Sequence, residues 1–233
     1  MKYLLGYLAA ICVLILVAAQ SIAIPTFMKS FYGYHFEKLQ IPQSIEVEHD
    51  ELMRVTGEML DYMKGRRDDL IIESVVGGEE REFFNEREKD HMADVYDLFA
   101  IGFKVRNVAF WSLIFFILLM IVLKIPVAYF LARCCREVLA GFISLAALLI
   151  IIIAIDFNRA FEVFHLMFFD NDLWLLDPST DLLINIVPQK FFVNISIAIG
   201  VLISTFSIAI VAVSSVYLRR VSKFERYPGA AAK

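Results

Sequence analysis

The sequence predicts a mainly α-helical membrane protein with four transmembrane helices and a small mixed α/β extracytoplasmic cap. Hydrophobic residues make up 59% of the 233 residues, and the mean hydropathy is +0.67. Soluble domains are usually only about 45–50% apolar. Helices long enough to cross about 30 Å of hydrocarbon are expected where apolar residues run together. Four such runs occur, at roughly Leu4–Ile24, Val108–Leu123, Val138–Ile155 and Asn194–Leu218.

The first two runs need separate comment. Leu4–Ile24 resembles a secretory signal, but its 21 residues exceed the usual apolar stretch of about 7–15 residues, so we interpret it as a retained helix. Val108–Leu123 is short for a span. Because the apolar stretch Val127–Ala132 follows Lys124 and Pro126, we expect this helix to continue to Leu131.

Basic residues predict the orientation, because they favour the cytoplasmic side of a membrane. They gather between the second and third runs and after the fourth, as Lys124, Arg133, Arg136, Arg219, Arg220, Lys223 and Arg226. Residues 26–107 instead hold 11 basic and 18 acidic residues, and 156–193 hold 2 and 6. Both termini are therefore expected in the cytoplasm and both long connections outside it.

These observations divide the chain into five parts. They are transmembrane helix 1 (1–25), an extracytoplasmic cap (26–107), transmembrane helices 2 and 3 with a short cytoplasmic connection (108–155), an aromatic extracytoplasmic interfacial segment (156–193), and transmembrane helix 4 with a cytoplasmic tail (194–233). The last residues, 228–233 (PGAAAK), have the composition of an appended expression remnant.

The cap shows signals of both strands and helices. Tyr32, Tyr34 and Phe36 alternate within 31–41, which predicts a strand. Apolar residues recur at helical spacing over 52–63 before a capping glycine, Gly65. Residues 70–76 (LIIESVV) predict a strand that ends at Gly77-Gly78. Glu79–Gly102 is then expected to be an amphipathic helix whose buried face is interrupted by Glu88 and His91.

The connection 156–193 is rich in aromatic residues. Its rings are Phe157, Phe161, Phe164, Phe168, Phe169, Trp174, Phe191 and Phe192. Such a density predicts either an aromatic belt at the membrane boundary or the lining of an acyl-chain site. Asp170 and Trp174 add polar groups and turn chemistry to the same segment.

Several function classes find no support. No basic groove interleaved with aromatic residues occurs, so nucleic acid is not an expected partner. The three cysteines, Cys12, Cys134 and Cys135, lie in or beside the spans, so no disulfide is expected outside the membrane. The sequence contains no G-x-S-x-G motif, which disfavours a covalent acyl-enzyme.

Two histidines are the main candidates for chemistry. Glu88-x-x-His91 and Glu162-x-x-His165 are matching frames that lie just outside predicted spans. An ionisable group at this boundary is a candidate functional residue, and two imidazoles can act as general base and acid. His35 and His49 are interpreted instead as structural or solvated side chains.

Two alternatives remain open at this point. The paired E-x-x-H frames resemble those of di-iron carboxylate proteins, and Glu58 is a further possible ligand, so a metal-dependent hydrolase at the outer membrane boundary is one alternative. The other is a non-enzymatic sensor that holds lipid through its aromatic residues. A cofactor is not expected.

Two stretches carry a family resemblance. Glu86–Asp97 (EREKDHMADVYD) and Phe164–Pro178 (FHLMFFDNDLWLLDP) resemble the bacterial lipoprotein intramolecular transacylases, and the similarity extends over nearly the whole chain. It implies that the sn-2 acyl chain of an S-diacylglyceryl lipoprotein moves to the α-amine of its N-terminal cysteine, at the outer leaflet of the cytoplasmic membrane.

The resemblance also implies roles for particular residues. The catalytic histidines of the family correspond to His91 and His165. The residues predicted to support catalysis or bind substrate are Glu88, Asp94, Glu162, Phe164, Phe168, Asp170 and Trp174. The expected partners are a diacylated lipoprotein substrate and membrane lipids, and the protein is expected to be a monomer.

Overall fold

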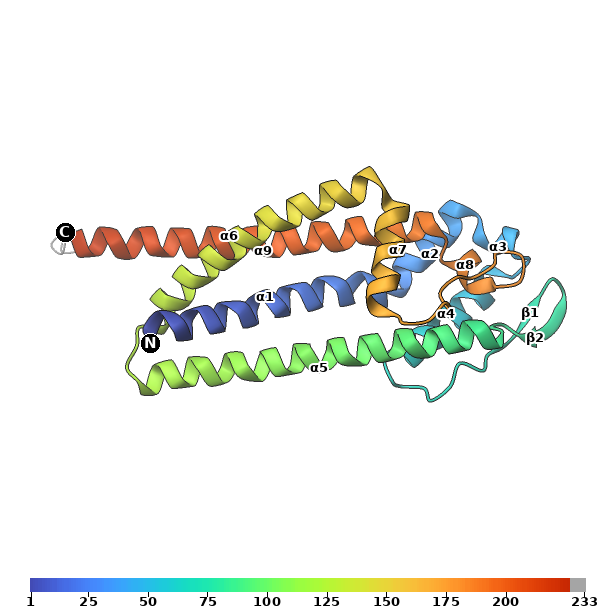
Figure 1. Cartoon of the computed structure of the whole chain (residues 1–233), viewed down its shortest axis with the longest axis horizontal. Coiled ribbons are helices and arrows are strands. Elements are labelled where there is room, and N and C mark those ends of the chain that lie inside the picture. The colour runs from blue at the N-terminus through green and yellow to red at the C-terminus, as the bar shows by residue number, and fades with distance from the viewer. Residues whose placement is uncertain (227–233) are drawn as a thin grey trace. The chain divides into compact units, whose positions relative to one another are not determined.

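The computed structural model describes residues 1–226, without the side chains of 149, 152, 154 and 223–226 (Figure 1). The predicted remnant 228–233 lies outside this range. The helices are α1 (Lys2–Phe27), α2 (Lys29–Leu39), α3 (Ile41–Ser44), α4 (His49–Met63), α5 (Glu86–Val122), α6 (Val127–Ile155), α7 (Phe157–Phe168), α8 (Leu182–Ile186) and α9 (Gln189–Arg226). One two-stranded antiparallel sheet is formed by β1 (Glu73–Val76) and β2 (Glu79–Glu82).

The chain divides into two compact units. The helical unit comprises Met1–Ser21, Lys104–Ala154 and the residues from Ile199 onward. The cap unit comprises Ile22–Phe103 and Ile155–Ala198. The mainly helical fold with one small sheet agrees with the predicted fold class.

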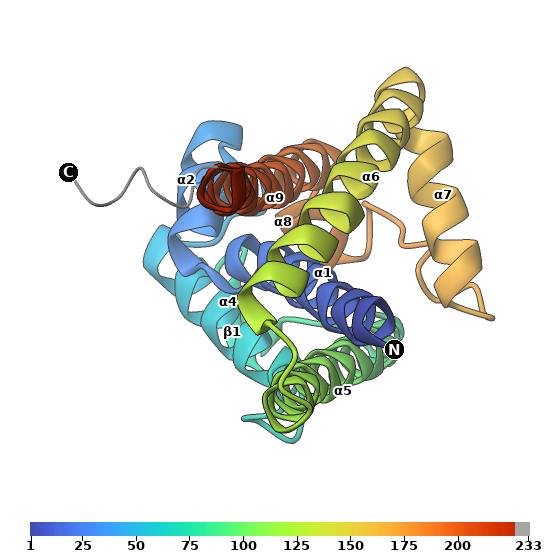
Figure 2. The ribbon, with the colours of Figure 1, turned by 90° about the vertical axis from the view of Figure 1, so that its left-hand side faces the viewer.

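The helical unit is held together by contacts of α1 with its neighbours (Figure 2). Leu5 packs with Met120, Ile125 and Phe130, which come from α5, the connection after it, and α6. Further along α1, Ala10 packs with Cys134 and its neighbours, and α9 contributes to the same cluster. Gly6 permits the approach to α6, since a Cβ at this position would lie 2.7 Å from Cys134 Sγ.

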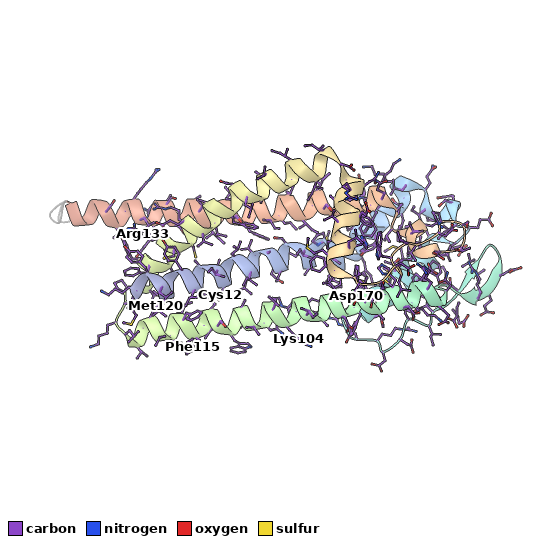
Figure 3. All side chains as sticks on the ribbon, in the orientation of Figure 1. Cys12, Lys104, Phe115, Met120, Arg133 and Asp170 are labelled. Carbon is purple, nitrogen blue, oxygen red and sulfur yellow. The ribbon has the colours of Figure 1, made fainter. Side chains whose placement is uncertain are left out.

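Three of the described helices are long and apolar enough to cross a membrane. They are α1, α5 and α9, whose most apolar stretches have mean hydropathies of 2.4, 2.2 and 2.4. Large apolar side chains of these helices, such as Phe115, point away from the protein (Figure 3). Lipid is the environment in which such a surface is stable, so the chain is a membrane protein. The third predicted span, Val138–Ile155, lies in α6, while the first, second and fourth correspond to α1, α5 and α9.

The predicted extension of the second span to Leu131 is wrong. α5 ends at Val122, Lys124 has a left-handed φ of 54°, and α6 begins at Val127. Pro126 explains the break, because a proline disfavours helical geometry in the residue before it while fitting well at a helix start. Residues 127–132 therefore open the third long helix.

The cap unit differs from the sequence prediction in two places. Residues 31–41 were expected to form a strand, but Lys29–Leu39 is the helix α2, whose buried residues are Tyr32, His35 and Phe36. His35 and Phe36 are three and four positions after Tyr32, so all three lie on one face of the helix. Tyr34, which lies between them in the sequence, is 58% exposed. The alternating aromatic residues therefore belong to a helix in which Tyr32 and Phe36 are buried and Tyr34 is exposed.

The second difference concerns 79–85. The predicted helix Glu79–Gly102 begins only at Glu86, because residues 79–82 pair with β1 in the register Val76↔Glu79 and Glu73↔Glu82. Gly77 and Gly78 have φ of 62° and 85°, as the turn between paired strands requires. The predicted strand 70–76 is confirmed over Glu73–Val76.

The predicted helix over 52–63 is confirmed as α4. Gly65 follows it with a left-handed φ of 68°, and its N–H donates to the carbonyl of Tyr62 at 2.8 Å. His49 begins this helix, and His35 lies buried on α2 rather than on the strand expected for it.

Candidate active site

His91 and His165 lie together inside the cap unit. Their ring centroids are 6.3 Å apart, with 36° between the ring planes. His91 is 8% exposed and His165 is 6% exposed. The first comes from α5 and the second from α7, 74 positions further along the chain. The pairing expected from the two matching sequence frames is present in the structure.

Aromatic rings enclose the pair. Phe169 lies against both, with centroids 5.5 Å from His91 and 5.6 Å from His165. Trp174 stacks on His165 at 4.8 Å, and Phe161 approaches it at 4.2 Å. These contacts keep water away from the imidazoles and fix the plane of His165.

The hydrogen bond of His165 decides which of its nitrogens is basic. Nδ1 lies 2.7 Å from the carbonyl oxygen of Phe161, one turn earlier on α7. A carbonyl only accepts, so Nδ1 carries the proton and donates it to this bond. Nε2 of the neutral ring therefore keeps its lone pair and can accept a proton.

His91 has a different environment. Its Nδ1 is buried and has no hydrogen-bond partner among the described residues. Burial lowers the pKa of His91 to about 4. His165 acts in the same direction, Asp94 opposes it, and Arg87 adds a smaller lowering effect. Burial also lowers the pKa of His165, opposed by its bond to Phe161. Both rings are therefore neutral at pH 7.

Neither histidine lies in the continuous apolar stretch of a long helix. The first turns of α5 carry dense charge, including Glu86, Arg87, Lys89 and Asp90, and such a stretch is not stable in hydrocarbon. The apolar part of α5 follows from about Val108. α7 is a separate helix of 12 residues, too short to span.

Glu88 is buried, 1% exposed, and joins two helix starts. Its Oε2 accepts from the N–H of Asn85 at 2.7 Å, while the side chain of Asn85 accepts from the N–H of Glu88 at 3.0 Å. This reciprocal pair is a capping box at the start of α5. Oε1 of Glu88 accepts from the N–H of Leu183 at 2.5 Å, in the first turn of α8.

Asp181 completes this junction. It accepts hydrogen bonds from Asn85, Thr180 and the N–H of Asp177 at 2.7–2.8 Å. Burial opposes its charged form, but these donors outweigh burial and lower the pKa of Asp181. Burial, assisted by the charge of Asp181, raises the pKa of Glu88, and the backbone N–H groups of Asn85, Leu183 and Leu182 oppose this rise. Glu88 therefore orders the chain around His91, one turn before that residue, and has no free oxygen directed at the rings.

α5 also holds the loop after α7 at two further points. Arg87 Nη2 donates to the carbonyl of Asp172 at 2.5 Å. Asp94 accepts from the side-chain nitrogen of Asn171 at 2.8 Å. The backbone carbonyl of Asn171 in turn accepts a hydrogen bond from Trp174 Nε1 at 3.0 Å. Asp94 thereby positions the tryptophan that stacks on His165, rather than bonding to His91 itself.

The other predicted site residues lie at the edge of the ring cluster. Phe164 is 43% exposed and Phe168 50% exposed, and they pack on each other at 4.9 Å. Asp170 is exposed just after α7 (Figure 3). Glu162 pairs with Arg159 at 2.7 Å on the surface. Of these four, only Phe164 has a ring contact with a histidine, at 5.3 Å from His165.

The carboxylates do not gather as the metal alternative requires. Glu58 pairs with Arg54 and Arg67 on and near α4, and Glu88 and Glu162 have the partners described above. Among the described residues, no group of three or more His, Cys, Asp or Glu side chains is arranged to hold a metal ion.

Sequence reasoning missed Asn85, Arg87, Asn171 and Asp181 and did not select Phe169 from its aromatic neighbours. One of these carried a usable signal, because Asn85 three residues before Glu88 is the pattern of a capping box. The others act through contacts over 77–96 positions, which no local pattern indicates.

Comparison with known families decides the assignment. A family model described as lipoprotein intramolecular transacylase Lit matches residues 7–192, most of the chain. The chain belongs to the Lit family. It is therefore an acyltransferase, a lipoprotein intramolecular transacylase. This membership favours neither the metal-dependent hydrolase nor the non-enzymatic lipid sensor.

Solved structures show the same fold. The membrane-integral lipoprotein intramolecular transacylase Lit from Bacillus cereus has 20% sequence identity and a TM-score of 0.79, covering 96% of this chain and 98% of that one. Two variants of the same protein, with a histidine replaced by arginine or by alanine, have TM-scores of 0.72 and 0.73 at 20% identity. They cover 97% and 96% of this chain and 95% and 96% of theirs. No curated protein matches this Lit chain significantly.

The lowered pKa of His91 predicts a pH-dependent stability. Between pH 6.5 and 5 the unfolded chain binds a proton at this position that the folded protein does not. Stability therefore rises with pH through this window and levels off above pH 6.5, with a contribution of about 2 kcal/mol. The pH dependence is measured from the thermal unfolding temperature of the detergent-solubilised protein between pH 5 and 7.5.

The matched variants are His91→Gln and His49→Gln. The first should flatten the slope of unfolding temperature against pH, and the second, at the start of α4, should leave it unchanged. Equal slopes in wild type and His91→Gln would show that His91 is not buried as a neutral ring.

Proposed function

We propose that this Lit protein moves the sn-2 acyl chain of an S-diacylglyceryl lipoprotein onto the α-amine of the same N-terminal cysteine. The observation that carries the proposal is the pair of buried neutral imidazoles with centroids 6.3 Å apart. Groups of this kind, on either side of one ester carbonyl, suit proton transfer and oxyanion stabilisation without a covalent intermediate.

Positioning is the first requirement of this reaction. Attack of the amine on the sn-2 carbonyl closes a ring of eight atoms: the nitrogen, two cysteine carbons, sulfur, two glyceryl carbons, the ester oxygen and the carbonyl carbon. Rings of this size form reluctantly in solution. Holding the reacting groups in place supplies on the order of 7–11 kcal/mol in favourable cases. Phe164, which contacts His165, and Phe168, which packs on Phe164, are exposed and offer the apolar surface for acyl chains.

His165 is proposed as the base. Its Nδ1 is committed to Phe161, so Nε2 accepts the proton that the attacking amine loses as the N–C bond forms. The C–O bond to glycerol then breaks, and the same Nε2–H returns the proton to the departing alkoxide. Ester and amine become amide and alcohol, so atoms and protons balance without a cofactor or a second acyl donor.

His91 is proposed to stabilise the oxyanion of the tetrahedral intermediate. A ring with a pKa of about 4 is neutral, so it acts by donating a hydrogen bond rather than by releasing a full proton. The aromatic shell, with Phe169 against both rings, keeps water from intercepting the ester.

The topology is part of the proposal. α6 would be a fourth span alongside α1, α5 and α9, with both termini in the cytoplasm, because Lys124, Arg133 and Arg219 flank the spans on one side. The acidic cap unit and its histidines would then face the extracytoplasmic side. One chain supplies every residue of the site, so we propose that the monomer is active.

Mass spectrometry of a lipoprotein N-terminal peptide tests the proposal. Expression of the protein in cells that lack the activity should convert the free-amine diacylglyceryl peptide into the N-acyl, S-monoacylglyceryl form. The reaction is an isomerisation, so the intact mass does not change, and fragmentation must locate one acyl chain on nitrogen.

Two other outcomes would contradict the proposal. A peptide that keeps both chains on glycerol would show that no transfer occurs. A peptide lighter by one acyl chain would show hydrolysis instead of transfer.

A further inference from the structure

A basic pocket in the helical unit is not used by the proposed reaction. It lies between the first turns of α6 and the end of the described part of α9 and has a volume of about 260 Å³. Its lining residues are Tyr129, Arg133, Arg136, Leu218, Arg219, Val221 and Ser222. Three guanidinium groups therefore share one small space with the hydroxyl groups of Tyr129 and Ser222, the latter donating to the Arg219 carbonyl at 3.0 Å, and with an apolar wall.

The positive charge of this pocket is incompletely balanced. Glu137 is the carboxylate beside it, and its Oε1 lies 3.3 Å from Arg133 Nε and 3.9 Å from Arg136 Nη2. Its other oxygen accepts from Tyr7 at 2.5 Å. Within the described residues, Arg219 makes no ion pair, and the buried Nε of Arg133 makes no hydrogen bond despite its nearness to Glu137. Two of the three cations therefore pair with the same carboxylate, and the third, Arg219, has no anion among the described residues.

The pocket lies at the level where both helices change from apolar to charged residues. On α6 the apolar run begins at Val138, directly after Arg136 and Glu137. On α9 the apolar run ends at Leu218, directly before Arg219. The boundary between hydrocarbon and water is the level of the lipid phosphates. Leu218 and Val221 would then face the start of an acyl chain.

We propose that this pocket binds the phosphate of an anionic phospholipid. Guanidinium groups form paired hydrogen bonds to phosphate oxygens, and a bound phosphate would supply the negative charge that Glu137 alone does not. The chemistry recognised is a phosphate group, and the apolar wall at the membrane boundary favours a lipid over the free ion. This inference concerns the helical unit and does not depend on the proposed reaction.

Native mass spectrometry of the full chain, released from detergent with added phosphatidylglycerol or phosphatidylcholine, tests the pocket. Wild type should retain one phosphatidylglycerol in preference to phosphatidylcholine. The double variant Arg136→Gln with Arg219→Gln should lose roughly tenfold in retention, as expected for removing charge-assisted bonds. If it does not fold, Arg219→Gln alone, at an exposed position, gives the same comparison.

Arg220→Gln is the matched control, because it removes the same charge from the adjacent position, which does not line the pocket. It should retain phosphatidylglycerol like wild type. Equal losses from Arg219→Gln and Arg220→Gln would indicate a diffuse basic surface and overturn the site. Displacement of the lipid by excess inorganic phosphate would show that the pocket binds the free ion, and no preference for phosphatidylglycerol in wild type would also contradict the proposal.

Discussion

Replacing His165 with alanine is expected to lower the rate of N-acylated peptide formation by about 10²–10⁴-fold, the usual contribution of a positioned general base. The proposed base is lost, and both oxygens of the nearby Glu88 are committed to backbone N–H donors. Replacing His91 with alanine should lower the rate by on the order of 10²–10³-fold, as removal of one oxyanion donor does. Fragmentation of the lipoprotein peptide measures both.

Conservative variants separate the two roles. His91→Gln keeps a side-chain donor and should recover part of the activity that His91→Ala loses. His165→Gln cannot cycle a proton and should remain as inactive as His165→Ala. Recovered activity in His165→Gln but not in His91→Gln would instead make His91 the base and His165 the oxyanion donor.

His49→Ala is the control for both substitutions. His49 begins α4 and has no ring contact with the histidine pair, so this variant should keep wild-type product. Each variant must also insert in the membrane at wild-type level. Wild-type product from either active-site variant would remove that histidine from the mechanism.

Replacing Glu88 with alanine is expected to have the largest effect on stability. The change leaves the N–H groups of Asn85 and Leu183 without acceptors in a buried position and opens a cavity at the junction of α5 and α8. Buried unsatisfied groups and a lost helix cap together cost about 3 kcal/mol. The unfolding temperature of the detergent-solubilised protein should fall accordingly.

Two further variants interpret that result. Glu88→Gln keeps the volume but directs an amide N–H₂ toward a backbone donor, so it should be intermediate between wild type and alanine. Glu86→Ala removes a carboxylate from the same first turn, where the side chain is 87% exposed and pairs only with Lys89 among the described residues, and it should change stability little. Equal effects of Glu86→Ala and Glu88→Ala would show that the loss comes from helix charge rather than from the buried bonds.

The secondary structure of the cap unit could be predicted where the pattern that specifies it lies in neighbouring residues. The glycine pair Gly77-Gly78 and the helical spacing of α4 were correctly interpreted, because turn geometry and amphipathic burial are written in neighbouring residues. α2 was predicted as a strand because Tyr32, Tyr34 and Phe36 alternate along the chain. With Tyr34 exposed, the remaining pair, Tyr32 and Phe36, is also spaced as on one face of a helix. Only the packing of Tyr32 and Phe36 decided between strand and helix.

The candidate site shows the same division. His91 and His165 were selected from matching sequence frames, and the structure places their rings together. Glu88 was selected for the right reason, a polar residue on a buried face, but its contacts make it a cap for two helices rather than a group facing substrate. Asp181 and Asn171 carried no recognisable signal, since each acts on a partner far away in the chain.

The sequence by itself determined the membrane character, the mainly helical class and the choice of His91 and His165 as candidate residues. The length of an apolar run, the placement of charge and the spacing of a motif are properties of short segments. The tertiary structure alone decided that Trp174 stacks on His165, that Phe169 contacts both imidazoles, and that three arginines meet in one pocket. These depend on how α5 packs with the α7–α8 loop and how α6 packs with α9. Burial and hydrogen-bond satisfaction select such packing over the whole fold, and no single segment contains that information.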